Sequence, residues 1–269
     1  MTAFVRRVAD LAGLPEAELE RLAGGDLSEV LLIRRPGLPP SVAKGGPAVA
    51  TEASMLRAMR AAGAPVPAVE GEHAAVLLLE HVEGDGLFSP RAWGDIGLQL
   101  ARLHGHRGEL YGWPVDYALG TVQIDNRERP DWPGFWAEQR LGTVAAMLDK
   151  PWRERVARLG GRLEERLPRR PPPSLLHGDL WTGNLIVRDG ALAAFIDPCC
   201  YHGHAEVDLA MLTLFDDPPD SFWEAYGPLE PDWRDRRPIY QLFPALVHLR
   251  LFGDGYATLA DRLLRALGV

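Results

Sequence analysis

The apolar positions of the first eighty residues follow two different periods. Spacings of three and four residues, typical of a helix with one buried face, run through the first fourteen residues and again from Ala50 to Met59. Short apolar runs bounded by turn residues predict strands instead. These runs cover residues 29–33, 41–44 and 74–79. The pattern therefore predicts a small β-rich unit that carries two helices.

Helical spacing dominates the rest of the chain. Apolar residues repeat at three and four positions from Trp93 to Leu103, and helical patterns return from Glu206 to the C-terminus. The polar, glycine-rich stretch at 83–86 is the best candidate boundary. We therefore expect an α+β protein with a β-rich N-terminal lobe (1–83) and a larger, mainly helical C-terminal lobe (84–269). The aromatic, Gly- and Pro-rich segment 111–141 favours substrate contact over core building.

A hairpin is predicted around Asp189-Gly190, which separates the apolar runs 185–187 and 192–196. Folding the chain at this turn brings Asn184 and Asp197 to the same end of two neighbouring strands. Mg²⁺ prefers a few hard oxygen ligands together with substrate phosphates. We therefore interpret the hairpin as a clamp in which Asn184 and Asp197 hold magnesium.

The same two residues complete a spacing found in kinases. A kinase catalytic loop has an Asp, four residues and then an Asn, followed by a second metal-binding Asp. Here Asp179, Asn184 and Asp197 occupy those positions, within HGDLWTGN and IDP. The spacing predicts a phosphotransferase in which Asp179 accepts or orients the substrate hydroxyl proton.

Composition gives the upstream lysine additional weight. The chain contains 27 arginines but only two lysines, Lys44 and Lys150. Lys44 ends a predicted strand as Val-Ala-Lys, close to the kinase motif whose lysine pairs with nucleotide phosphates, and Glu52 lies in the next helix where it can orient Lys44. Glu52 could instead stabilise the N-terminus of its helix. Gly24 and Gly25, which precede the first strand, could bring backbone amides to the phosphates or simply form a turn.

Charge and cysteine content narrow the class further. A net charge of -8 argues against binding to a nucleic-acid backbone, which requires clustered Lys and Arg. No apolar run is long enough to span a membrane and the N-terminus has no signal-peptide core, so we expect a cytoplasmic protein. Cys199 and Cys200 are adjacent, which excludes an unstrained disulfide between them. For both cysteines, the role of a small, buried packing residue is favoured over a redox role.

The motifs HGDLWTGNLIV and IDPCCYHGHAEVDLAML strongly resemble the fructosamine kinases, a family within the aminoglycoside phosphotransferase and protein kinase-like fold. The Trp of GDLW and the residues that follow IDP are more particular to this family, and the likeness extends from about Leu22 to Leu214. The chain departs from the usual family pattern at Tyr117, where Asn is common, and at Cys199, where Ala is common. Further similar positions are Leu119-Gly120-Thr121, Gln123, Asp131-Trp132, Phe135 and Glu138-Gln139-Arg140-Leu141.

The resemblance implies a two-lobed protein kinase-like fold and ATP-dependent phosphorylation of a sugar hydroxyl on a ketosamine. Such a substrate is a fructosamine or ribulosamine, free or protein-bound, and the activity would be a deglycation repair. The resemblance also implies that Glu80 and Val82 lie at the adenine hinge and that Trp181 faces the sugar.

Other functions remain open from the sequence. The acceptor could be an aminoglycoside, choline or another small alcohol, and the chain could be a nucleotide-binding pseudoenzyme. A metal hydrolase is a further alternative, because His202, His204, Glu206 and Asp208 form a set that includes the zinc-binding pattern His-x-His. In the kinase interpretation, Glu206 and Asp208 brace the catalytic loop.

Overall fold

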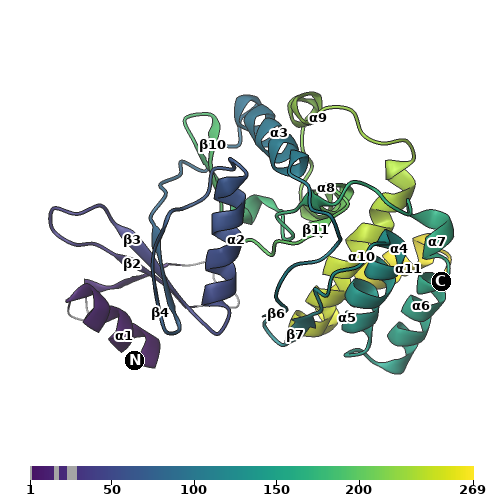
Figure 1. Cartoon of the computed structure of the whole chain (residues 1–269), viewed down its shortest axis with the longest axis horizontal. Helices are drawn as coiled ribbons and strands as arrows, with labels where there is room; N and C mark the ends of the chain where they lie inside the picture. The colour runs from purple at the N-terminus through teal and green to yellow at the C-terminus, as the bar shows by residue number, and fades with distance from the viewer. Residues whose placement is uncertain (1, 15–17, 23–28) are drawn as a thin grey trace.

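A five-stranded antiparallel sheet forms the smaller lobe of the computed structural model, which describes residues 2–14, 18–22 and 29–269 (Figure 1). The spatial order of its strands is β1-β2-β3-β5-β4. The predicted strands at 29–33, 41–44 and 74–79 correspond to β2, β3 and β5, whereas β4 was not predicted. The strands are β1 (Glu20–Arg21), β2 (Glu29–Ile33), β3 (Ser41–Gly45), β4 (Val69–His73) and β5 (Val76–Glu80).

Helices cover both faces of this sheet, as the apolar run of β5 requires. Leu77 and Leu79 join the core cluster that includes the buried face of α2 (Val49–Ala61). The alternate residue Val76 packs instead with the cluster of α1 (Ala3–Ala12). Figure 1 shows α2 on the side of the sheet that faces the larger lobe. The helix α2 therefore lies next to the junction between the lobes.

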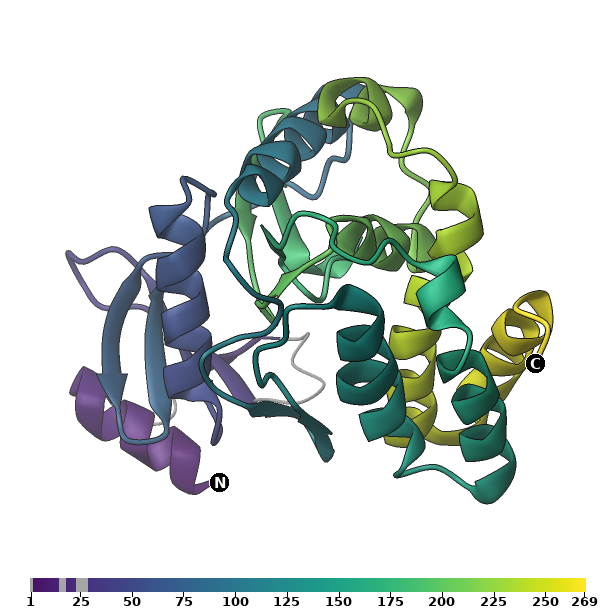
Figure 2. The same cartoon turned by 45° about the vertical axis from the view of Figure 1, so that its right-hand side comes forward.

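The larger lobe is built mainly of helices (Figures 1 and 2). Its first long helix starts as its sequence dictates, since Ser89 caps the N-terminus by accepting a hydrogen bond from the Ala92 N–H at 3.2 Å and Pro90 occupies the first turn. The helices are α3 (Pro90–Gly105), α4 (Trp132–Gly134), the π-helix η2 (Phe135–Gly142), α5 (Thr143–Ala145), α6 (Lys150–Gly160), α7 (Leu163–Arg166), the 3₁₀ helix η3 (Thr182–Asn184), α8 (Glu206–Phe215), α9 (Asp220–Tyr226), α10 (Trp233–Phe252), the 3₁₀ helix η4 (Gly253–Tyr256) and α11 (Ala257–Ala266).

Three two-stranded antiparallel pairs complete this lobe. The pair β9 and β10 is the hairpin predicted around Asp189-Gly190. Figures 1 and 2 place the pair β6 and β7 near the opening between the two lobes. The strands are β6 (Tyr117–Leu119), β7 (Val122–Ile124), β8 (Ser174–Leu175), β9 (Leu185–Arg188), β10 (Ala191–Phe195) and β11 (His202–Gly203).

The aromatic segment 111–141 builds core, and the expectation that it mainly contacts substrate is wrong for its largest side chains. Trp132, Phe135 and Trp136 are 0% exposed, and Tyr111 is also buried. The Trp132 ring packs at centroid distances of 5.5 Å from Phe135 and 5.4 Å from Trp136. Rings of this size bury large apolar areas, which outweighs the local turn signals of Gly and Pro.

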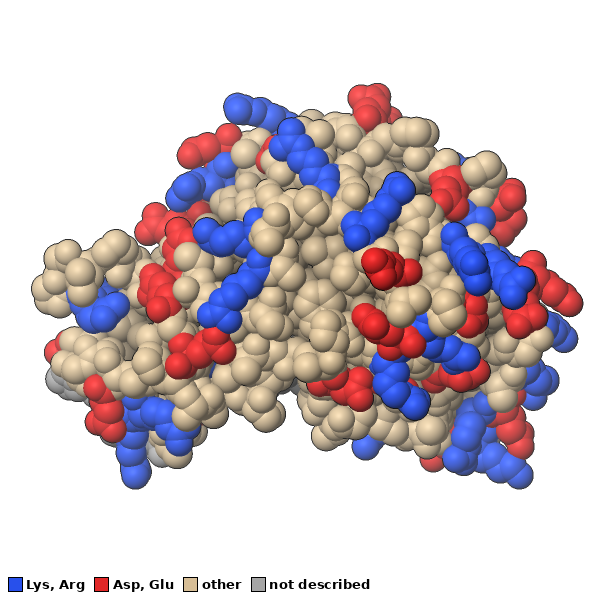
Figure 3. All heavy atoms as spheres, viewed as in Figure 1, with Lys and Arg blue, Asp and Glu red and all other residues tan. Residues whose placement is uncertain are grey.

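The surface carries both signs of charge. On the face drawn in Figure 3, Lys and Arg are interspersed with Asp and Glu, and the lower middle of the view is mostly uncharged. None of the helices in the described part of the chain is both long and apolar enough to cross a bilayer.

Candidate active site

The hairpin β9-β10 brings Asn184 and Asp197 together, as the turn sequence predicts. Asp189 and Gly190 both have positive φ, 54° and 72°, the conformation that a tight hairpin turn of this kind needs. At the other end of the hairpin the Ile196 N–H donates to the Asn184 carbonyl at 3.0 Å. Asp197 follows directly and itself has a φ of 54°, an uncommon backbone conformation for a residue with a Cβ.

Lys44 pairs with one carboxylate from each lobe, Glu52 of the small lobe and Asp197 of the large lobe. Its ammonium group donates to Glu52 Oε1 at 2.6 Å and to Asp197 Oδ1 at 2.8 Å. The Lys44 side chain is buried, whereas that of Asp197 is 40% exposed. Burial works to lower the pKa of Lys44, but the two carboxylates raise it above its ordinary value. Lys44 is therefore a fixed positive charge held between α2 and the hairpin.

Asp179 lies beside Asn184 at the start of the loop that leads into η3. The Asn184 amide nitrogen donates to the Asp179 carbonyl at 2.8 Å and to Asp179 Oδ2 at 3.0 Å. Burial raises the pKa of the Asp179 carboxyl, although the nearby charge of His177 works in the opposite direction. A carboxylate with a raised pKa is better suited to accept a proton than an ordinary surface Asp.

Oxygen donors remain for a metal ion at the end of the hairpin. Because the Asn184 nitrogen is used by Asp179, its Oδ1 is left as an acceptor, and Lys44 occupies only Oδ1 of Asp197. One amide oxygen and one carboxylate oxygen suit Mg²⁺, which takes few protein ligands and completes its shell with water and phosphate. The donor set therefore fits the predicted ion.

Asp208 holds the catalytic loop from beneath. Its carboxylate is 0% exposed and accepts hydrogen bonds from the backbone N–H groups of His177 at 2.8 Å and Gly178 at 2.9 Å, and from His104 Nε2 at 3.0 Å. The sequence-based expectation that Asp208 braces the loop is confirmed. Glu206 does not share this role, because it pairs with Arg236 on α10 at 2.8 Å.

His104, the third partner of Asp208, lies near the end of α3. The histidine is buried, and Tyr226 O–H lies 2.9 Å from its Nδ1, on the opposite side of the ring from Asp208. No local pattern marks it, since its partners are distant in sequence. The one signal that could have predicted its burial is its position near the end of the predicted helix from Trp93 to Leu103.

Trp181 extends from the same loop. Its side chain is 41% exposed, and its ring folds back over Gly183, where a Cβ would collide with it. The next residue, Thr182, is fixed by Asp216, which accepts from its N–H at 2.9 Å and from its Oγ1 at 2.7 Å. An exposed ring on an anchored loop two residues after Asp179 is available for contact with a substrate.

Of the residues expected at the hinge, Glu80 is the last residue of β5 and Val82 lies just after it. The Glu80 N–H donates to the Ala68 carbonyl at 2.9 Å, and its carboxylate accepts from the Ala68 N–H at 3.0 Å. The N–H of Val82 has no hydrogen-bond partner among the residues that the structure describes. Val82 could therefore offer a backbone donor to a nucleotide base. Gly24 and Gly25 lie outside the described residues.

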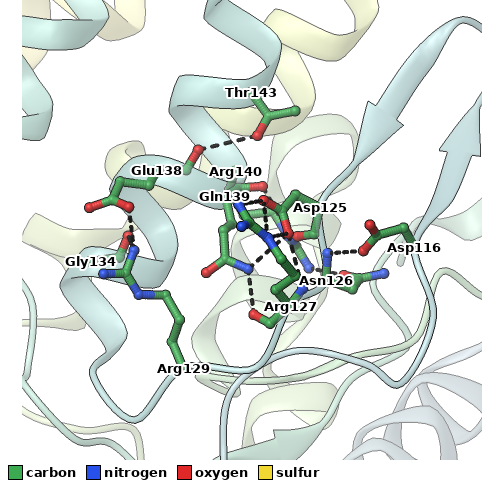
Figure 4. Close-up of polar contacts among 10 residues, drawn as sticks. All are labelled: Asp116, Asp125, Asn126, Arg127, Arg129, Gly134, Glu138, Gln139, Arg140 and Thr143. Carbon is green, nitrogen blue, oxygen red and sulfur yellow. Dashed lines mark hydrogen bonds and ion pairs between the residues drawn. The ribbon is translucent and has the colours of Figure 1, made fainter.

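A buried arginine network fixes the base of the β6-β7 hairpin (Figure 4). Arg140, 0% exposed, donates to the Asp125 carbonyl at 2.7 Å and to Asn126 Oδ1 at 2.7 Å. Its guanidinium lies 4.0 Å from the centre of the Tyr201 ring. Tyr117 on β6 in turn donates its O–H to the Cys199 carbonyl at 3.0 Å. The hairpin is thereby tied to the segment that follows Asp197.

Of the four zinc-hydrolase candidates, His204 and Glu206 lie together, whereas His202 and Asp208 do not belong to their group. In the described part of the chain, the one group of at least three His, Cys, Asp or Glu side chains close enough to share a metal is His204, Glu206 and Glu230. Arg236 inserts its charge among them, 2.8 Å from Glu206 and 3.7 Å from Glu230. An arginine at this position neutralises the carboxylates and opposes a cation.

The thiols lie next to the candidate metal residue but are inert by environment. Cys199 and Cys200 are both buried and free. Burial raises the pKa of each thiol well above its ordinary value. Since the thiolate is the reactive form, this environment favours a packing role over redox chemistry.

Comparison with known proteins agrees with this geometry. The family model for fructosamine kinase matches residues 43–268. An Enterococcus faecium protein that carries the name ketoamine kinase is 36% identical over 205 residues, which cover 72% of this chain and 73% of that protein. A Thermobifida fusca crystal structure that carries the name fructosamine-3-kinase superposes with a TM-score of 0.86, at 31% identity over 98% of each chain.

A more distant match shows the fold alone. An amicoumacin kinase solved in complex with AMP-PNP and Ca²⁺ superposes with a TM-score of 0.65 at 15% identity, covering 97% of this chain and 92% of that one. The predicted α+β, two-lobed kinase-like fold is thus confirmed, with a β-rich small lobe and a mainly helical large lobe.

Proposed function

Because the chain belongs to the fructosamine kinase family, whose model matches residues 43–268, we propose that this ATP-dependent phosphotransferase acts on a sugar hydroxyl of a ketosamine. The observation that carries the proposal is the convergence of Lys44, Glu52 and Asp197, with contacts of 2.6 and 2.8 Å at one ammonium group, at the end of the hairpin that also holds Asn184. Fructosamine and ribulosamine, free or protein-bound, are the candidate acceptors, and repair of glycated amines is the corresponding role.

Asp179 carries the proton chemistry in this proposal. Its carboxylate accepts or orients the proton of the sugar hydroxyl, whose oxygen bonds to the γ-phosphorus of ATP as the bond to the ADP oxygen breaks. The Asn184 amide, 3.0 Å from Asp179 Oδ2, holds that carboxylate in one orientation. Trp181 offers its exposed ring to the sugar.

The remaining groups position and neutralise the nucleotide. Lys44 supplies a fixed positive charge to the phosphates and is itself oriented by Glu52. Asn184 and Asp197 would hold Mg²⁺, which supplies charge neutralisation at the phosphate oxygens. Glu80 and Val82 would line the adenine end, with Gly24 and Gly25 near the phosphates. Positioning and charge stabilisation account for most of phosphoryl-transfer catalysis, so this set is sufficient in principle.

A coupled assay of ADP release tests the proposal directly. Wild-type protein would be assayed with fructosamine, ribulosamine, an aminoglycoside and choline at equal concentrations. The ketosamines are expected to give the highest kcat/KM. A preference for the aminoglycoside or choline would support one of those kinases instead, and ATP binding with no turnover on any acceptor would indicate a pseudoenzyme.

The substitution Asp179→Asn separates chemistry from binding. We expect kcat to fall by about 10²–10⁴-fold, the range for loss of a general base, with ATP affinity retained in calorimetry. Near wild-type turnover in this variant would remove Asp179 from its assigned role.

A further inference from the structure

Exposed aromatic side chains gather beside the catalytic loop. Among the described residues, eight large apolar side chains are clearly exposed, and five of them are aliphatic. The three aromatic ones are Trp181, Phe215 and Phe252, at 41%, 40% and 46% exposure. Exposed aromatic rings that lie together are a more informative observation than single exposed leucines.

Two of these rings belong to a continuous strip. The His248 ring lies 5.2 Å from Phe215, 5.4 Å from Phe252 and 4.9 Å from Tyr256, measured between centroids. Phe215 ends α8 and Phe252 ends α10, and these helices pack against each other. We call Phe215, His248, Phe252 and Tyr256 the aromatic strip.

The strip begins where the catalytic loop is anchored. Asp216, which fixes Thr182 through hydrogen bonds of 2.9 and 2.7 Å, directly follows Phe215. Trp181 directly precedes Thr182, so the loop that carries the proposed sugar-facing ring is tied at this anchor to the residue after Phe215.

His248 is half-buried within the strip. Its Nδ1 lies 2.8 Å from the Pro244 carbonyl, so Nδ1 carries a proton and donates it to that oxygen. No described residue bonds to its Nε2. The strip therefore presents exposed ring surface and one polar atom, a combination typical of a ligand-binding wall.

We propose that the aromatic strip binds the amine substituent of the ketosamine, and that it selects substituents that are aromatic or apolar. This inference rests on the proposed function. A ketosamine carries its variable group on the amine, next to the sugar. When the substrate hydroxyl meets Asp179 and the sugar meets Trp181, the strip is the exposed aromatic surface tied to the same loop that can receive this group. Apolar groups gain most from contact with exposed rings, while a heavily charged substituent would lose hydration there.

A pair of fructosamines that differ only in the substituent tests the inference. The benzylamine and ethanolamine adducts share the sugar and the ammonium group. Wild-type protein is expected to prefer the benzyl compound by about tenfold in kcat/KM, which equals about 1.4 kcal/mol. Phe252→Ala and Phe215→Ala should each reduce this ratio several-fold while activity on the ethanolamine adduct is largely kept. Leu38→Ala, an equally conservative truncation at a 56% exposed site on the small lobe, is the control and should keep the wild-type ratio.

The outcomes separate the two proposals. If no ketosamine is phosphorylated, the proposed function fails. If both fructosamines are phosphorylated with equal kcat/KM, or if the benzyl preference survives unchanged in both Phe variants, the proposed function stands and the inference about the strip is wrong.

Discussion

Replacing Asp208 with asparagine should both destabilise the protein and disable its catalytic loop. The Asp208 carboxylate is fully buried and accepts three hydrogen bonds, from the N–H groups of His177 and Gly178 and from His104, at 2.8, 2.9 and 3.0 Å. Asparagine keeps the shape but has only one oxygen. Its NH₂ group must face one of these donors, which leaves a buried N–H without an acceptor.

The size of the effect follows from these contacts. An unsatisfied buried donor costs about 1–3 kcal/mol, and the surviving bonds lose the extra strength that a charged acceptor gives. We expect a total loss of about 3–5 kcal/mol, a large share of the roughly 5–15 kcal/mol that stabilises a typical domain. At about 2–4 °C per kcal/mol for a chain of this size, the melting temperature should fall by about 10 °C.

Thermal unfolding followed by circular dichroism measures this loss, and ADP release below the transition measures kcat. Asp261→Asn is the matched control, because it removes the same charge from a partly exposed site that pairs with Arg155 and Arg265. Its melting temperature should stay close to that of the wild-type protein. If Asp208→Asn melted like the wild-type protein and kept its kcat, the bracing role would be refuted.

The same variant has a pH signature. Burial alone would raise the pKa of Asp208, but hydrogen bonds from His104 and the Gly178 N–H and the nearby charges hold it below its ordinary value. A carboxyl with a lowered pKa stabilises the fold above its unfolded pKa of about 4 and loses that contribution as the pH falls through the folded value. The difference in melting temperature between wild type and Asp208→Asn should therefore be full near pH 7 and shrink below about pH 4.

Three further outcomes are expected. Lys44→Met should raise the KM for ATP and lower kcat by at least about tenfold. Glu52→Gln leaves the contact between Lys44 and Asp197 in place and should have the milder effect. The reverse ranking of the two variants would contradict the assigned roles. Asn184→Ala should raise the Mg²⁺ concentration needed for half-maximal activity, and an unchanged titration would exclude Asn184 as a ligand. Iodoacetamide should leave activity unchanged in the native protein and modify Cys199 and Cys200 only after denaturation. The reason is that both thiols are buried and have a raised pKa. Rapid inactivation would argue against the interpretation of both cysteines as buried packing residues.

Local sequence patterns predict the parts of this molecule that depend on neighbours in the chain. The turn at Asp189-Gly190 and the apolar runs beside it determine the hairpin, and the hairpin determines that Asn184 and Asp197 meet. The strand β4 was not predicted because apolar and polar residues do not alternate regularly along it. Its sequence Val-Glu-Gly-Glu-His suits the edge of the sheet, where one side meets solvent.

Contacts between distant segments required the structure. Arg140 would be placed on the surface by its charge, yet it is fully buried because two aromatic rings and two oxygen acceptors from the β7 end surround its guanidinium. His104 and Asp208 lie 104 residues apart, so the hydrogen bond between them has no local signal. The aromatic strip likewise exists only because the ends of α8 and α10 meet.

The central claim is that a phosphoryl group moves from ATP to the sugar of a ketosamine. Phosphorus NMR of a reaction of ATP, Mg²⁺ and a fructosamine with the wild-type protein tests it most directly. The account predicts a new phosphate monoester resonance that couples to a sugar proton, grows in step with ADP and is absent with Asp179→Asn. ADP accompanied only by inorganic phosphate, or an ester that forms equally well with Asp179→Asn, would contradict it.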